Sequence, residues 1–145
     1  MLSLSVVSPV KNILNTDCTK ITVPTESGLI TILPSHAPLF SLLNHGEVVI
    51  KNGNSETQYI LVSGGFVSVS EDKVILLTDY GARSDELDEE VIMEAKKRAE
   101  HVLEEAKSDS LTKAAQADLF HANLELQFLY RRGKRHTSIT GSKPH

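Results

Sequence analysis

The residues able to do acid–base or metal chemistry are spread thinly along the chain. The six histidines and Cys18 show no spacing typical of metal ligands. The carboxylate pairs Glu89–Glu90 and Glu104–Glu105 lie among basic residues of a predicted helix, which favours a solvated helix face over an acid–base pair. The phosphate-binding, GxSxG and HExxH motifs do not occur. The sequence therefore predicts no catalytic residue, no metal and no cofactor.

Two prolines enclose a short segment in "TILPSHAPLF" (31–40). Proline donates no hydrogen bond to a sheet and pushes the preceding residue into extended geometry, so the prolines should end a strand and fix a rigid bend. The bend consists of Pro34, Ser35, His36, Ala37 and Pro38. The ring of His36 either contacts a partner or satisfies local backbone groups. Because a rigid loop loses little entropy on binding, we expect this loop to be a contact surface.

Four basic residues lie close together near the C-terminus: Arg131, Arg132, Lys134 and Arg135. The cluster could be a nucleic-acid tail, a solvated helix end favoured by the helix dipole, or a contact for an acidic partner. A net charge of −4 and a pI of about 5.8 argue against nucleic acid. Gly133 is expected to end the helix, which leaves 133–145 as a flexible basic and polar tail.

Length and composition limit the class of protein. Of the 145 residues, 40% are hydrophobic and only 5% aromatic, which predicts an aliphatic core. The single cysteine, Cys18, cannot form an internal disulfide and is expected to be a small buried hydrophobe. No segment approaches the ~20 apolar residues that span a bilayer, and the N-terminus does not resemble a secretory signal. We expect a soluble chain that reaches a membrane only through a partner.

Residues 1–83 show the short apolar runs and period-two alternation typical of β-strands. Asn52–Gly53 predicts one hairpin turn, and "FVSVSEDKVILL" (66–77) predicts a second hairpin that turns near Glu71–Asp72. Gly64–Gly65 indicates a bulge or a close approach of two backbones. Seven or more short strands at this spacing predict an antiparallel β-sandwich or a flattened barrel.

After Arg83 the apolar residues recur at three- or four-residue steps, as on one face of a helix. Ser84 can cap a first helix and Ser110 a second. The first expected apolar stripe is Leu87, Val91, Ala95, Ala99, Val102 and Ala106. The second is Leu111, Ala115, Leu119, Ala122, Leu126 and Leu129. Residues 84–132 are therefore predicted to form a two-helix hairpin.

The predicted fold class is β + α, an N-terminal antiparallel β-sandwich followed by a C-terminal antiparallel helical hairpin. The helix stripes are narrow and partly made of alanine, so they bury little area. Two interpretations stay open. The hairpin is either a permanently packed appendage or a marginally held element that can detach or open.

The order of three stretches closely resembles the epsilon subunit of the bacterial type of F-type ATP synthase. They are "ITVPTESGLITILPSHAPLF" (21–40), "VSGGFVSVSEDKVILLTD" (62–79) and "SDELDEEVIMEAKKRAE" (84–100). The resemblance covers about Leu2 to Arg132. Its most specific pieces are the proline–histidine–alanine–proline loop and the serine–glycine–glycine–phenylalanine stretch.

This resemblance implies a non-catalytic central-stalk subunit of a proton-translocating ATP synthase, peripheral to the cytoplasmic face of the bacterial plasma membrane. In that family the sandwich binds the gamma subunit and sits on the ring of c subunits. The hairpin either folds against the sandwich or extends along gamma into the catalytic head, where it inhibits hydrolysis. Residues 34–38 then become rotor-interface candidates. The four basic residues become candidates for an inhibitory contact with an acidic segment of the beta subunit.

Some members of the family bind ATP through a leucine/isoleucine–aspartate–x–x–arginine–alanine motif on the first helix. This chain reads "LDEEVI" at 87–92, so that Leu87 and Asp88 match and the arginine–alanine pair is missing. Asp88 and Arg98 are the remaining candidates for contact with ATP. Since no fork of arginines faces the triphosphate, we expect ATP binding to be weak or absent.

Two alternatives to the rotor subunit remain at this stage. One is a free-standing nucleotide-binding module whose hairpin clamps the ligand, and it predicts thermal stabilisation by nucleotide. The other is a basic-tailed nucleic-acid adaptor, which predicts binding that falls steeply with salt.

Overall fold

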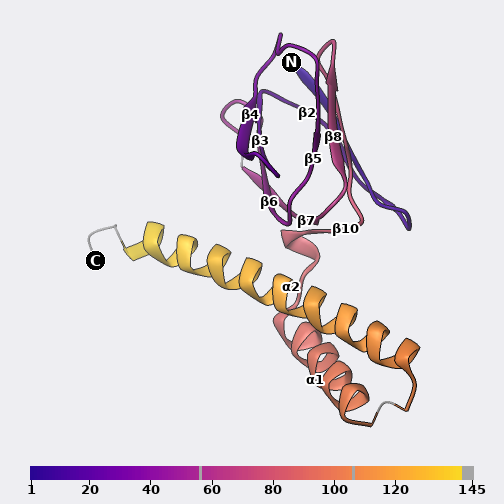
Figure 1. The fold of residues 1–145 in the computed structure, drawn as a ribbon. Coiled ribbons are helices and arrows are strands. Elements are labelled where there is room, and N and C mark those ends of the chain that lie inside the picture. Colours follow the sequence, from indigo (N-terminus) through magenta and orange to yellow (C-terminus); the bar gives the residue numbers. More distant parts are fainter. Residues whose placement is uncertain (56, 106, 142–145) are drawn as a thin grey trace. The chain divides into compact units, whose positions relative to one another are not determined.

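The computed structural model describes residues 1–55, 57–105 and 107–141, of which 132–141 are described by their backbone alone. The chain divides into two compact units, Met1–Asp85 and Glu86–His145. The first unit is all β and the second is all helical (Figure 1). This arrangement confirms the predicted fold class.

The first unit is a sandwich of two five-stranded sheets, with the orders β2-β1-β9-β8-β5 and β10-β7-β6-β3-β4. We refer to them as sheet A and sheet B. The strands are β1 (Leu2–Val7), β2 (Asn12–Cys18), β3 (Lys20–Thr25), β4 (Gly28–Ile32), β5 (Leu39–Leu42), β6 (Gly46–Lys51), β7 (Gln58–Ser63), β8 (Phe66–Ser70), β9 (Lys73–Leu77) and β10 (Tyr80–Arg83). The pairings are antiparallel except for β1 with β9, which run parallel.

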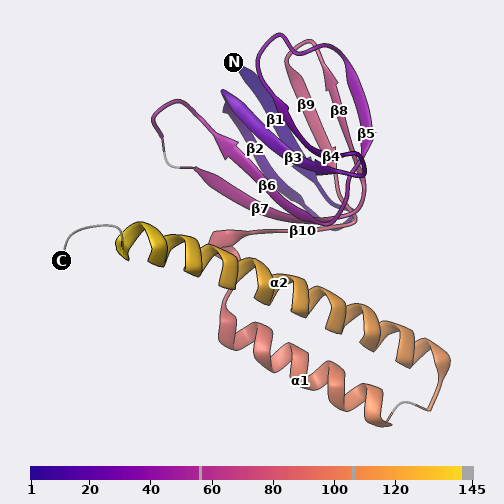
Figure 2. The same cartoon turned by 60° about the vertical axis from the view of Figure 1, so that its left-hand side comes forward.

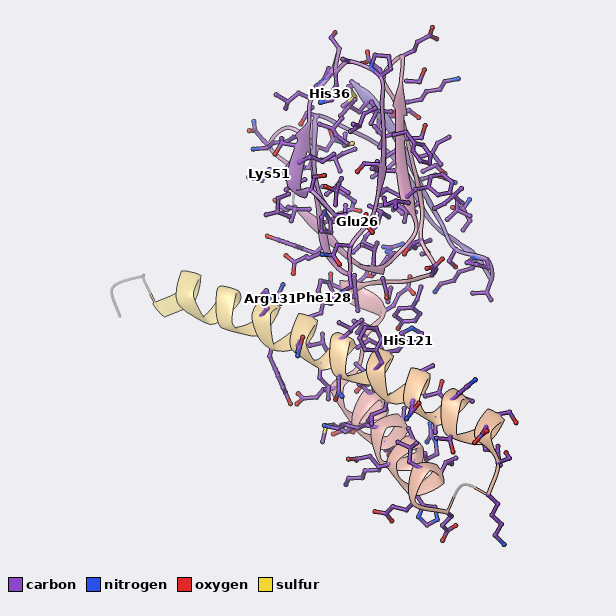
Figure 3. The ribbon with its side chains drawn as sticks, in the orientation of Figure 1. Glu26, His36, Lys51, His121, Phe128 and Arg131 are labelled. Atoms are coloured by element: carbon purple, nitrogen blue, oxygen red, sulfur yellow. The ribbon has the colours of Figure 1, made fainter. Side chains whose placement is uncertain are left out.

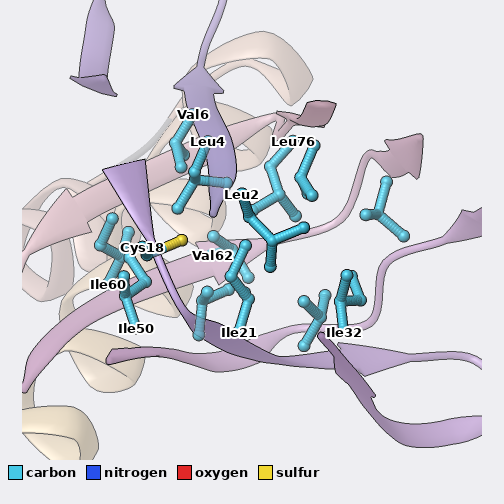
Figure 4. Packing of buried hydrophobic residues seen from close by; sticks show 14 of the residues in the cluster. Leu2, Leu4, Val6, Cys18, Ile21, Ile32, Ile50, Ile60, Val62 and Leu76 are labelled. Carbon is cyan, nitrogen blue, oxygen red and sulfur yellow. The ribbon is translucent and has the colours of Figure 1, made fainter. Parts of the chain in front are cut away.

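Alternating apolar residues of the two sheets form the core between them (Figure 4). In β1, for example, Leu2, Leu4 and Val6 are buried, whereas the serines between them are not. Cys18 lies in the same core with no exposed surface, which confirms its prediction as a buried hydrophobe. Burial, with a smaller contribution from the negative charge of Asp17, raises the pKa of the Cys18 thiol.

Both predicted β-hairpins are present. The connection from β6 to β7 contains Gly53, whose φ of +57° is the left-handed conformation that an Asn-Gly turn uses. Strands β8 and β9 are joined by the two residues Glu71 and Asp72, with φ of +51° and +63°. Two successive positive φ angles are typical of the tight turn that matches the twist of paired strands.

Gly65 is the point at which two backbones come close, as the glycine pair predicted. A Cβ atom at this position would overlap the carbonyl oxygen of Leu77 and the Cα of Thr78. The φ of Gly65 is +106°, a value that L side chains rarely adopt. No other residue therefore fits at position 65 without a movement of strand β9.

The second unit contains helix α1 (Glu89–Glu105) and helix α2 (Asp109–Gly141), and the 3₁₀ turn η1 (Ser84–Glu86) lies across the boundary between the two units. The predicted caps were wrong by a few residues. Asp88 caps α1, because its carboxylate accepts a hydrogen bond of 2.9 Å from the backbone N–H of Glu90. Ser84 instead enters the 3₁₀ turn.

At the start of α2 the cap is Ser108, not Ser110. The hydroxyl oxygen of Ser108 accepts a hydrogen bond of 3.2 Å from the N–H of Leu111. Serine side chains at both positions can accept such a bond, and the earlier one lengthens the helix by two residues. Residue 106, between the two helices, lies outside the described residues.

The prediction that the second helix ends at Gly133 was also wrong, because α2 continues to Gly141. A glycine inside a helix costs only about 1 kcal/mol relative to alanine, which is too little to stop a long helix. The predicted tail 133–145 is thus helical through Gly141, and residues 142–145 lie outside the described residues. With 33 residues against 17, α2 runs on past the start of α1 (Figure 2).

The two helices pack side by side through a small cluster of Ile92, Ala122 and Leu126, supported by Leu87, Met93 and Leu129. Most of the predicted stripe of α2 is buried or half-buried, but Leu111 is exposed. In α1 the predicted stripe was right in part. Ala99 is buried and Leu87 and Ala95 are half-buried, as predicted. Val91 and Val102 are exposed instead, and Ile92, which the prediction left out, is buried.

Candidate functional site

The loop from Leu33 to Pro38 connects β4 of sheet B to β5 of sheet A, and two hydrogen bonds fix its shape. The N–H of Ser35 donates to Oδ1 of Asp72 at 2.6 Å, which ties the loop to the turn between β8 and β9. The N–H of His36 donates to the carbonyl oxygen of Leu33 at 3.1 Å, and Ser35 has a φ of +67°. The loop is therefore a defined structure, as the two prolines predicted.

The ring of His36 is engaged within the loop itself. Its Nδ1 lies 2.7 Å from the carbonyl oxygen of Ala37, and the residue is half-buried (labelled in Figure 3). This geometry supports the interpretation that the ring satisfies local backbone groups. Pro34, Ser35, Ala37 and Pro38 are exposed, so the loop remains a candidate contact surface through these four residues.

The outer side of sheet A carries an exposed row of apolar side chains that the sequence analysis missed. In register across the strands, Leu42 lies opposite Phe66, Phe66 opposite Leu77, and Leu77 opposite Val7. One row further, Phe40 and Ile75 also face outward, and the rings of Phe40 and Phe66 are 5.0 Å apart between centroids. We call these six residues the apolar face.

Exposure of the apolar face is high for large hydrophobic residues. Phe40 is 65% exposed, Leu42 50%, Ile75 43% and Leu77 38%. At one end of the face lies an open, mainly apolar pocket of about 370 Å³, lined by Val7, Ser8, Pro9, Gly65, Phe66, Leu77, Thr78 and Asp79. A contiguous apolar surface of this kind is typical of a site that another protein covers.

One signal in the sequence could have revealed this face. The strand "KVILL" (73–77) carries apolar residues at consecutive positions, whereas a strand with one solvated side alternates. Val74 and Leu76 fill the core, so Ile75 and Leu77 must point to the other side. An uninterrupted apolar run is thus typical of a strand that is covered on both sides.

The two ATP-binding candidates of the hairpin do not meet. The Asp88 carboxylate caps α1, and Arg98 lies exposed on the same helix ten positions later, about 15 Å along the axis at the rise of an α-helix. A cap carboxylate and a distant arginine do not form a phosphate site. The structure therefore gives no support to the nucleotide clamp.

The basic cluster lies on the part of α2 that runs past α1. Arg131 is exposed (labelled in Figure 3), whereas the side chains of Arg132, Lys134 and Arg135 lie outside the described residues. Because the helix continues through Gly133, positions 131, 134 and 135 have the i, i+3, i+4 spacing of one helix face. A helix that continues through Gly133 favours simultaneous contact of three basic residues with one partner more than a helix that ends at Gly133 would.

Two classes of site are missing from the part of the chain that the structure describes. Within it, no three histidine, cysteine or carboxylate side chains gather closely enough to bind a metal ion. None of its helices is long and apolar enough to span a membrane.

Comparisons with known proteins place the chain in a family. The sequence model of the ATP synthase delta/epsilon chain β-sandwich domain matches residues 1–83. The ATP synthase epsilon chain of Alkalilimnicola ehrlichii is 37% identical over 134 residues, which are 92% of this chain and 96% of the relative. The epsilon chain of Dichelobacter nodosus is 40% identical over 98 residues, 68% of each chain.

Solved structures share the fold at low sequence identity. A chain of the Euglena gracilis mitochondrial ATP synthase matches with a TM-score of 0.60 and 20% identity, covering 81% of this chain and 74% of its own. A chain of the Tetrahymena thermophila central stalk and c-ring matches with a TM-score of 0.52 and 17% identity, covering 88% and 96%.

The fold, a β-sandwich followed by a helical hairpin, is shared with chains of solved ATP synthases, and the match over residues 1–83 assigns the sandwich to the class of ATP synthase delta/epsilon chains. Within this class the chain belongs to the ATP synthase epsilon chain family. It is accordingly a non-catalytic subunit of the ATP synthase, as the resemblance implied.

Proposed function

We propose that the sandwich (1–83) couples the gamma subunit to the ring of c subunits and that the hairpin (84–132) restrains ATP hydrolysis. The observation that carries the coupling role is the apolar face of sheet A. If this face stayed in water, its large apolar side chains would remain hydrated. Each Å² of exposed apolar surface costs about 25 cal/mol of free energy. Docking of gamma on this face would remove that cost.

The loop at 34–38 is a second rotor contact in this proposal. It is tied to the turn at Asp72 by the Ser35 hydrogen bond, so it can meet a partner without reordering. It also leads directly into Phe40 of the apolar face. A continuous surface from the loop to the pocket at Pro9 would then lie against the rotor.

The inhibitory role is assigned to the extension of α2. Positions 131, 134 and 135 present cations along one helix face, and an acidic segment of the beta subunit would be their partner. Each exposed ion pair is worth only about 0–1 kcal/mol, so the contact needs several of them together. The subunit would act on the cytoplasmic face of a bacterial plasma membrane, held there only through the complex.

The deciding experiment measures ATP hydrolysis and binding by the catalytic head lacking this subunit. The head is titrated with the full chain and with a chain ending at Asp85, which keeps the whole sandwich core. If both bind and only the full chain slows hydrolysis, the sandwich is the anchor and the hairpin inhibits. If both bind and neither inhibits, the inhibitory role is wrong. If neither binds, the coupling role is wrong.

A matched pair of variants tests the basic cluster separately. The first replaces Arg131, Lys134 and Arg135 by glutamate. The second makes the same change at Lys97, Arg98 and Lys113, which are exposed on the body of the hairpin. We expect inhibition to be lost in the first and kept in the second, because only the first removes the cations from the extension. Equal effects would mean that net charge alone, not a specific contact, governs inhibition.

A further inference from the structure

We propose that the hairpin is fastened at the end where α1 begins, by a clasp formed by Tyr130, Glu89 and the apolar cluster beneath them, and that its helices fray first at the turn. We call these two ends the mouth and the turn end. The proposal rests on the proposed role of the hairpin as a switch. It adds which end of the hairpin holds the two helices together and which residues determine the fraction of molecules in which they are packed.

The central contact of the clasp is one hydrogen bond between the two helices. The Tyr130 hydroxyl of α2 donates to Oε1 of Glu89, the first residue of α1, at 3.2 Å. It links residues 41 positions apart, so it can form only while the hairpin is closed. This hydrogen bond, followed by the negative charge of Glu89, raises the pKa of Tyr130.

Apolar contacts concentrate at the same end of the hairpin. Ile92 of α1 packs with Ala122 and Leu126 of α2, and Leu87 and Leu129 are half-buried beside them. Asp88 caps α1 at this end, and Glu89 and Glu90 occupy its first turn, where the helix dipole favours carboxylates. The mouth thus combines cap, dipole, packing and the clasp hydrogen bond.

The turn end is built in the opposite way. The fully buried residues there are the small Ala99 and Ala115; Leu103 and Leu119 are half-buried, and Val102 and Leu111 are exposed. Helix α1 ends on Glu104 and Glu105, with no basic residue in its last turn, so two carboxylates lie at the negative end of the dipole. The absence of a large fully buried side chain among the described residues of this end, together with the unfavourable helix end, makes its helical turns the first to fray.

The clasp also lies next to the proposed inhibitory contact. Tyr130 directly precedes Arg131 and shares a helix face with position 134, four residues later. A partner that binds the basic cluster therefore meets the residue that holds the hairpin closed. The contact that is lost, Tyr130 with Glu89, and the contact that forms, Arg131 with an acidic segment, then lie on the same turn of α2.

The test uses the full chain, with Cys18→Ala so that labels attach only at introduced cysteines. One pair of spin labels crosses the turn end at Glu104→Cys and Lys113→Cys. A second crosses the mouth at Glu90→Cys and Gln127→Cys; all four positions are exposed. Pulsed electron resonance then gives the fraction of closed and separated helices for each pair.

Tyr130→Phe keeps the ring and removes only the hydroxyl, and Glu89→Gln removes the charge. We expect either variant to raise the ratio of open to closed hairpin roughly fivefold, the scale of one net hydrogen bond. The double variant should open no further than the stronger single one, because both remove the same contact. The control is His101→Ala, which breaks an exposed ion pair within α1 and should leave the ratio unchanged.

Unchanged distances in both single variants would overturn the clasp, and so would effects that simply add in the double variant. For the order of fraying, backbone amides of 111–117 should exchange with solvent faster than those of 119–128. Equal exchange of the two segments would overturn fraying that starts at the turn.

Alkaline titration provides an independent readout of the same bond. The phenol donates only while protonated, so the clasp is present below the ordinary pKa of tyrosine and is lost as the pH rises through the raised pKa of Tyr130. The difference in phenolate absorbance between the full chain and Tyr130→Phe isolates this residue. Its pKa should fall in Glu89→Gln, and an unchanged value would contradict the contact.

The same variants are finally added to the catalytic head. If Tyr130→Phe opens the free hairpin but leaves hydrolysis unchanged, the clasp holds and the inhibitory role of the hairpin is wrong. If the variant leaves the free hairpin closed, the clasp is wrong whatever the hydrolysis rate.

Discussion

The sandwich and the hairpin use apolar residues in contrasting ways. The sandwich fills the space between two sheets with fully buried aliphatic side chains such as Ile21, Val62 and Leu76. The hairpin has one small cluster around Ile92 and Leu126, while Val91, Val102 and Leu111 face solvent. The comparison contrasts a large closed apolar core with a small cluster that leaves neighbouring apolar side chains in water.

The same contrast holds for the connections within each unit. In the sandwich, the loop at Ser35 and the turn at Asp72 are joined by a hydrogen bond across 37 positions of sequence. In the hairpin, the linking segment at Ser108 makes only local bonds to the first turn of α2 among the contacts described. Long-range bonds resist deformation, whereas local bonds survive when the two helices separate.

The largest expected effect is a loss of stability of the sandwich, the rigid unit in this comparison. Gly65→Ala places a Cβ on the carbonyl oxygen of Leu77 and should destabilise the sandwich by more than ~3 kcal/mol or prevent its folding. The control is Gly28→Ala, whose φ is also positive but whose Cβ would meet no atom within 4 Å. Urea unfolding followed by far-ultraviolet circular dichroism measures both, and equal losses would contradict the close approach.

A second pair of substitutions compares the two cores directly. Leu76→Ala should cost the sandwich about 2–5 kcal/mol, because this side chain is fully buried. Leu126→Ala should lower the helical transition and leave the unfolding of the sandwich unchanged, since it packs in the separate cluster of the hairpin. Thermal melts at 222 nm, with hydrogen exchange of the strands, separate the transitions. A single shared transition in both variants would show that the units unfold as one.

The apolar face provides a third test, on binding. Phe40→Ser together with Leu42→Ser should weaken binding to the gamma subunit at least ~10-fold, because two exposed large side chains leave the proposed interface. The unfolding midpoint of the sandwich should hardly change, since neither residue belongs to the core. Val91→Ser, an equally exposed change on the hairpin, is the control for binding. Retained binding of the double variant would exclude this face as the gamma site.

Loss of the α1 cap should have a smaller effect. Asp88→Ala removes the acceptor for the N–H of Glu90 and should destabilise α1 by about 1 kcal/mol. Asp85→Ala is the matched control, because that carboxylate pairs with Arg83 on the surface and caps no α-helix. Helix content between pH 6 and 8 compares the two variants, and an equal loss in both would contradict the capping role of Asp88.

The smallest expected effect concerns nucleotide. Because Asp88 is engaged as a cap and Arg98 lies about 15 Å away along the helix, millimolar ATP should shift the melting temperature by less than about 1 °C. Magnesium chloride at the same ionic strength serves as the control for salt. A shift of several degrees, or calorimetric binding in the low micromolar range, would restore the nucleotide clamp.

Much of the sandwich could be predicted because its signals are local. Alternation in β1, the turn residues at Asn52–Gly53 and Glu71–Asp72, and the glycine pair at Gly64–Gly65 each require a particular backbone conformation. The stiff loop followed in the same way from Pro34 and Pro38. These residues act through their own backbone geometry, so a sequence is sufficient to read them.

The helix boundaries and faces were less predictable, because several residues compete for each role. Ser84 and Asp88 can both cap a helix, and only the formation of the 3₁₀ turn decides between them. Val91 and Ile92 are both strongly apolar, so only the packing of α1 on Ala122 and Leu126 of α2 decides which one is buried. Gly133 showed the weakness of intrinsic propensity, since the helix continues through it.

The apolar face and the clasp depend on tertiary neighbours. Phe66 and Leu77 face each other across the β8–β9 hairpin, but Phe40 joins them only because the distant strand β5 pairs with β8. The Tyr130–Glu89 bond likewise requires the antiparallel pairing of the two helices. Sequence patterns indicate that such residues are present, but not which ones meet.

The bond between Ser35 and Asp72 has a mechanical consequence for the sandwich. The loop leaves sheet B at Ile32 and enters sheet A at Leu39, so it is a covalent strap between the two sheets. Its attachment to the turn after β8 shortens the free length of that strap. A sideways force on one sheet then stretches this short strap and so pulls on the other sheet. The two sheets are thereby hindered from sliding past each other along the apolar core.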